Sequence, residues 1–92
     1  MSWKDIIKMN AQAIEQFTNA VVALADAIGE DGNYYRGLIN GYIDGARTYA
    51  IYVLQQWKKA GNATPEVEQA KEAVVSFMKN AGFSNHLRTI GL

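Results

Sequence analysis

The chain lacks several features that identify common classes of small protein. None of its 92 residues is cysteine, which excludes a disulfide scaffold and a thiolate zinc site. Its one histidine, His86, allows no histidine cluster, so we expect neither a metal nor a cofactor. No segment has the roughly 18 apolar residues of a membrane span. Charged and amide side chains interrupt the opening residues, so we also expect no signal peptide, and a cytoplasmic protein.

Net charge is absent as well. Nine Lys and Arg balance nine Asp and Glu, and the sequence pI is near 6.5. A dedicated nucleic-acid binder needs a basic field to neutralise phosphates, so this balance argues against one. The charge is nevertheless unevenly distributed, since residues 1–31 carry a formal charge of −3 and residues 32–60 one of +3.

The residues that are present predict a folded, single domain covering 1–92. The hydrophobic fraction is 49% and the charged fraction 20%, which is typical of a globular protein. A chain this short buries a modest share of its surface, so self-association is a natural supplement to its stability.

Apolar residues at alternating steps of four and three predict a first helix over about 3–28. Sustained spacing of this kind keeps one stripe of a helix against a partner helix. Only Asn10 interrupts the apolar character, and Gly29 ends the pattern. The stripe consists of Trp3, Ile7, Asn10, Ile14, Phe17, Val21, Leu24 and Ile28.

Two further helices and a short tail follow. The second is predicted over about 34–60, ending at Gly61, and the third over 65–81. Thr64 is a capping residue and Pro65 suits the first helical position, so the third helix has a well-marked start. The tail, with a helical turn predicted over 84–90, has enough apolar residues to fold back onto the helical bundle. The sequence therefore predicts an all-α protein, a compact bundle of three main helices and a short C-terminal helical turn, dimerised into a larger bundle.

Three glycines stand four residues apart in the second predicted helix. In one continuous helix Gly37, Gly41 and Gly45 form a single strip, with Tyr34 and Tyr52 on the same line. Each costs about 1 kcal/mol relative to alanine, which favours a compensating close contact. Another helix of the same chain, a second copy of the chain, or a foreign partner could supply it. A core-facing arc on a separate side of this helix predicts that it is the central one.

These features favour a protein-interaction module that is not an enzyme. We expect a homodimeric regulator, inhibitor or assembly factor that presents a helical surface to itself and to another protein. The predicted interface is Gly37, Gly41, Gly45, Tyr34 and Tyr52, and the predicted partner-binding residues are Tyr35, Arg36 and Arg47, because tyrosine and arginine are enriched in binding hot spots.

Other functions have weaker signals. His86 lies in a polar turn without an evident orienting partner, and Glu66, Glu68 and Glu72 are typical of a solvated helix face rather than a metal site. The alternative is a small nucleic-acid-binding regulator that uses the basic sector of the second helix, namely Arg36, Arg47, Lys58 and Lys59 with Trp57.

Overall fold

The computed structural model describes residues 11–41, 45–61 and 64–92. All regular elements within these ranges are helices, which confirms the all-α prediction. The first ten residues, including Asn10 and the predicted start of the first helix, lie outside the described residues, as do 42–44 and 62–63. The helices are α2 (Ala11–Ala27), α3 (Gly32–Gly41), α4 (Ala46–Ala60), α5 (Pro65–Asn80) and α6 (Ser84–Arg88).

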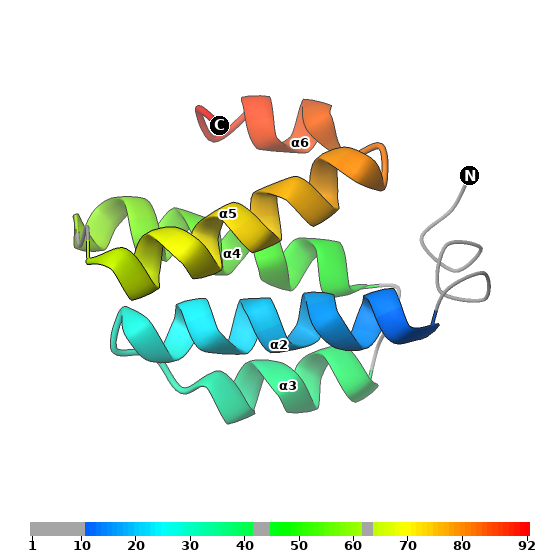
Figure 1. Ribbon diagram of the computed structural model, residues 1–92, viewed down its shortest axis with the longest axis horizontal. Coiled ribbons are helices and arrows are strands. Elements are labelled where there is room, and N and C mark those ends of the chain that lie inside the picture. The colour runs from blue at the N-terminus through cyan, green and yellow to red at the C-terminus, as the bar shows by residue number, and fades with distance from the viewer. Residues whose placement is uncertain (1–10, 42–44, 62–63) are drawn as a thin grey trace.

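Successive helices run in opposite directions (Figure 1). α2 lies in the middle of the assembly and contacts α3, α4 and α5. α3 covers one side of α2, whereas α4 and α5 cover the other, and α6 packs along the outer side of α5. The short connections between neighbouring helices account for this antiparallel order.

The predicted continuous helix over 34–60 is wrong, because the chain reverses between α3 and α4. In one helix, residues 17 positions apart would be separated by about 25 Å along the axis. The ring centroids of Tyr35 on α3 and Tyr52 on α4 are instead 6.0 Å apart. Gly41 ends α3, and Gly45 directly precedes α4. Both glycines are weak helix formers, so a helix can end here at little cost. The reversal lets both α3 and α4 bury an apolar face.

α2, rather than the segment over 34–60, is therefore the central helix. Phe17, Val21 and Leu24 are at most 1% exposed, which confirms the predicted stripe within the described residues. Thr18 and Ala25 are buried too, because helices cover α2 on two sides. The Thr18 hydroxyl donates a hydrogen bond to the Ile14 carbonyl at 2.9 Å, so its polar group is satisfied despite burial.

The ends of α4 and α5 agree with the sequence patterns. Gly61, at φ 64°, caps α4 in the left-handed conformation, which glycine adopts without strain. The Thr64 hydroxyl accepts a hydrogen bond from the Val67 N–H at the start of α5, with Pro65 in the first turn.

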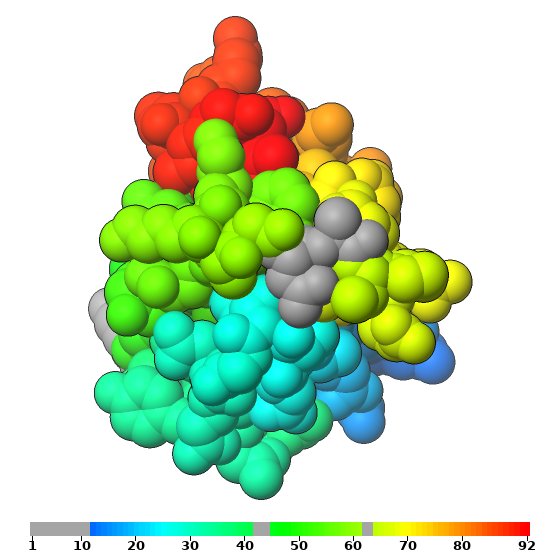
Figure 2. Space-filling model, turned by 90° about the vertical axis from the view of Figure 1, so that its left-hand side faces the viewer, coloured from blue at the N-terminus to red at the C-terminus, as the bar shows by residue number. Residues whose placement is uncertain are grey.

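The C-terminal residues fold back, as predicted. Phe83 and Leu87 are buried in the core. The Lys58 ammonium group donates a hydrogen bond to the Ile90 carbonyl at 2.6 Å, joining α4 to the tail. Figure 2 shows the tail, in red, resting on the end of α4, in green, with the α2–α3 turn, in cyan, below them.

Candidate functional site

The three predicted interface glycines do not form one strip. Gly37 and Gly41 lie on the exposed face of α3. Among the described residues, and apart from the chain neighbours and the backbone of α3 itself, no atom would lie within 4 Å of a Cβ added at either position. Gly45 is buried at the start of α4. Of the alternatives for the close contact, a helix of the same chain finds no support among the described residues, because none of the described helices packs on Gly37 or Gly41.

The close approach occurs at Gly32, which the glycine pattern did not single out. A Cβ there would lie 2.5 Å from Asp26 Oδ1 and 2.7 Å from both Val22 Cγ1 and the Val22 carbonyl oxygen. The Gly32 N–H donates a hydrogen bond to Asp26 Oδ1 at 2.8 Å. Gly32 lies between the first two helices that the sequence predicts, and spacing within one helix carries no information about contact with the preceding helix.

A hollow of about 310 Å³ opens between α3 and α4. Two of its tyrosines are the large hydrophobic residues that stand exposed in the described part of the chain, Tyr34 at 60% and Tyr52 at 46%. The Tyr34 and Tyr35 rings meet edge to face with centroids 5.5 Å apart. We call this feature the tyrosine hollow, and its lining residues are Tyr34, Tyr35, Leu38, Thr48, Tyr49 and Tyr52.

Tyr35 forms the inner wall of the tyrosine hollow. It is only 4% exposed, so little of this predicted partner-binding side chain is accessible from outside. Burial, the nearby Glu30 carboxylate and the Tyr52 side chain raise the pKa of Tyr35 from 10.0 to about 12. The phenol is therefore neutral at physiological pH.

We expect the protein to lose stability in alkaline solution through Tyr35. The unfolded chain releases this proton near pH 10, whereas the folded chain holds it to about pH 12. The stabilisation is complete below pH 10 and disappears as the pH rises through 12, with a total of about 2 to 3 kcal/mol. Urea unfolding at several alkaline pH values measures it. In the Tyr35→Phe variant, the free energy of unfolding should depend less on pH between 10 and 12. An unchanged pH dependence would contradict the assignment of this loss to Tyr35.

The basic residues of the predicted second helix are divided between α3 and α4. Arg36 on α3 donates a hydrogen bond to Asn19 on α2 at 3.1 Å. The Arg47 guanidinium on α4 lies 5.5 Å from the centroid of the Phe83 ring. His86 is exposed and meets the same ring edge-on. Two of the three predicted partner-binding residues, Arg36 and Arg47, thus have contacts within the chain, and neither lines the tyrosine hollow.

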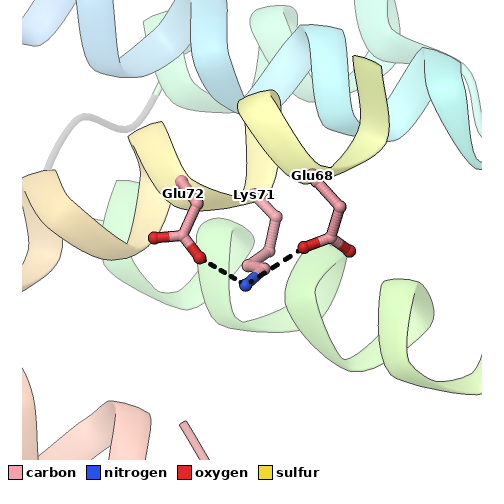
Figure 3. A network of polar contacts seen from close by, with 3 residues as sticks. All are labelled: Glu68, Lys71 and Glu72. Atoms are coloured by element: carbon pink, nitrogen blue, oxygen red, sulfur yellow. Dashed lines mark hydrogen bonds and ion pairs between the residues drawn. The ribbon is translucent and has the colours of Figure 1, made fainter. Parts of the chain in front are cut away.

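The acidic face of α5 forms ion pairs (Figure 3). Lys71 lies between Glu72 and Glu68, with N···O distances of 2.6 Å and 3.6 Å. The hydrogen bond with Lys71 lowers the pKa of Glu72, and the same bond raises the pKa of Lys71. The Lys71 ammonium also lies 5.1 Å from the centroid of the Trp57 ring. This arrangement is a surface network, and no cluster of three potential metal ligands occurs in residues 11–41, 45–61 and 64–92.

Comparisons with protein-family models, curated proteins and solved structures found no match. Among the described helices, none combines the length and the apolar character needed to cross a membrane.

Proposed function

We propose that this chain acts by binding protein, without catalysis, and that its first partner is a second copy of itself bound on the outer face of α3. The observation that carries the proposal is the arrangement on that face of an exposed Tyr34 and of Gly41, above which no other helix of the described residues lies. A regulatory, inhibitory or assembly role would follow from such a module.

The outer face of α3 is self-complementary. Tyr34 and Gly41 are seven residues apart, so they lie within about 20° of each other around the helix and about 10 Å apart along it. An antiparallel α3 pair with its two-fold axis between Gly37 and Leu38 would place each Tyr34 over the other copy's Gly41. A symmetric interface requires this kind of matching, because the same patch serves both sides.

The chemistry of the face also favours association. Tyr34 supplies a large, rigid ring whose hydroxyl can remain hydrated. Gly37 and Gly41 allow a second backbone to approach closely, and no side chain of the described residues occupies the space above them. The formal net charge of zero imposes no overall repulsion between copies.

We expect Gly41→Leu to shift the protein from dimer to monomer, because the new side chain occupies the space needed by the second copy's Tyr34. Sedimentation equilibrium over a concentration series measures the mass, and circular dichroism checks that the helices remain. Ala73→Leu is the matched control, since it adds a similar side chain at an exposed position of α5. A monomeric wild type at all concentrations would refute self-association, and a dimer unaffected by Gly41→Leu would refute this interface.

The absence of native cysteine permits a second readout of the same interface. Gly37→Cys should form a disulfide-linked dimer on mild oxidation, because the proposed axis brings the two Gly37 positions together. Ala73→Cys should remain uncrosslinked under the same conditions. Equal crosslinking of the two variants would indicate random collision and would contradict the proposed pairing.

A further inference from the structure

The tyrosine hollow has an electrostatic character that self-association on the outer face of α3 does not use. None of its six lining residues is charged at neutral pH. Aromatic rings present a negative face, and a cation within about 6 Å of a ring centroid is attracted to it. The Glu30 carboxylate adds a negative charge close enough to Tyr35 to affect its ionisation. The hollow therefore favours a positive group.

Two cations on the helices that form the hollow, Arg36 and Arg47, have other partners. Arg36 on α3 is bonded to Asn19 on α2, and Arg47 on α4 lies over Phe83. The chain pairs Arg47 and Lys71 with single aromatic rings, at 5.5 Å and 5.1 Å from the centroids. The four tyrosines of the hollow are, by contrast, a larger aromatic site, and none of its lining residues provides a cation.

Size and openness indicate what kind of cation would fit. A volume of about 310 Å³ is at the lower end of the roughly 300 to 1,000 Å³ found for small-molecule pockets. Tyr34 and Tyr52 remain 60% and 46% exposed, so the hollow would enclose only part of a ligand. A free small molecule generally needs most of its surface buried, whereas a side chain is also held by the polypeptide that carries it.

We propose that the tyrosine hollow binds an arginine side chain of a partner polypeptide, with the guanidinium group against the tyrosine rings. Arginine suits the site better than lysine because its planar group stacks on rings and is more weakly hydrated. The hollow shares Tyr34 with the proposed α3 pairing, and Leu38 lies beside the two-fold axis of that pairing. The peptide titration is therefore carried out on the Gly41→Leu variant as well, in which the pairing is expected to be lost.

The test uses two short peptides that differ in one atom group. The first, acetylated and amidated, has a central arginine between glycine and serine residues. In the second, citrulline replaces the arginine and keeps its shape without the charge. Titration followed by NMR of the tyrosine ring protons should show shifts at Tyr35, Tyr49 and Tyr52 with the arginine peptide. We expect it to bind about 5- to 30-fold more tightly than the citrulline peptide.

Variants of the hollow locate the binding. Tyr52→Phe keeps the ring and should retain the affinity, whereas Tyr52→Leu removes the ring at an exposed position and should weaken binding several-fold. Glu30→Gln should lower the affinity for the arginine peptide and leave the affinity for the citrulline peptide unchanged. Equal binding of both peptides would overturn the charge assignment, and no shift at the hollow tyrosines at millimolar peptide would overturn the site. Neither result bears on self-association, which the mass measurements decide separately.

Discussion

Replacing Gly32 with alanine is expected to lower the free energy of unfolding by about 3 kcal/mol, because the new Cβ would overlap atoms of α2. The nearest is Asp26 Oδ1 at 2.5 Å, which also accepts the Gly32 N–H, and the Val22 carbonyl oxygen at 2.7 Å belongs to the helix backbone. Relief requires α3 to move away from α2, which also weakens the hydrogen bond. Glycine is needed at position 32 because a side chain has no space there, and not for its backbone conformation, since Gly32 does not adopt a positive φ.

Thermal unfolding by circular dichroism measures this effect. A loss of about 3 kcal/mol in a domain of this size corresponds to roughly 12 to 24 °C in Tm. Gly37→Ala is the matched control, because Gly37 lies in the same helix with open space around it. It should raise stability by about 0.5 to 1 kcal/mol through helix propensity, at concentrations too low for association. Similar responses at Gly32 and Gly37 would contradict the close approach of α3 to α2.

Replacing Phe17 with alanine is expected to have the largest effect, a loss of about 3 to 5 kcal/mol. Phe17 is 1% exposed on the central helix, and its ring stacks on that of Phe77 with centroids 4.5 Å apart. Total stability for a chain of this length is about 5 to 14 kcal/mol, so the substitution removes a large part of it.

Two further variants separate burial from the ring contact. Phe17→Leu keeps most of the volume and should cost about 1 kcal/mol. Phe77→Ala removes the other ring of the stack from a partly exposed position on α5, so it should cost less than Phe17→Ala. Urea unfolding of the variants gives the comparison. A greater loss at Phe77 than at Phe17 would contradict the central position of α2.

The largest difference between prediction and structure concerns residues 34–60. Tyr34 through Gly41 and Ala46 through Ala60 each have a helical pattern, and both are helical in the structure. Periodicity, however, repeats regardless of a break, so it could not distinguish one long helix from two antiparallel ones. Assuming one long helix aligned Gly37, Gly41 and Gly45 in a single strip. It also placed Tyr35 far from Tyr52, although the fold brings these two rings together.

The sequence alone determined the helical class, the apolar stripe of α2 from Phe17 to Leu24, and the boundaries at Gly61 and Thr64, because these depend on residues close together along the chain. Only the tertiary structure decided that the chain reverses after α3, that Gly32 rather than Gly37 or Gly41 meets another backbone, and that tyrosines of two helices enclose one hollow. These features depend on which helices pack together, and a local pattern leaves that choice open.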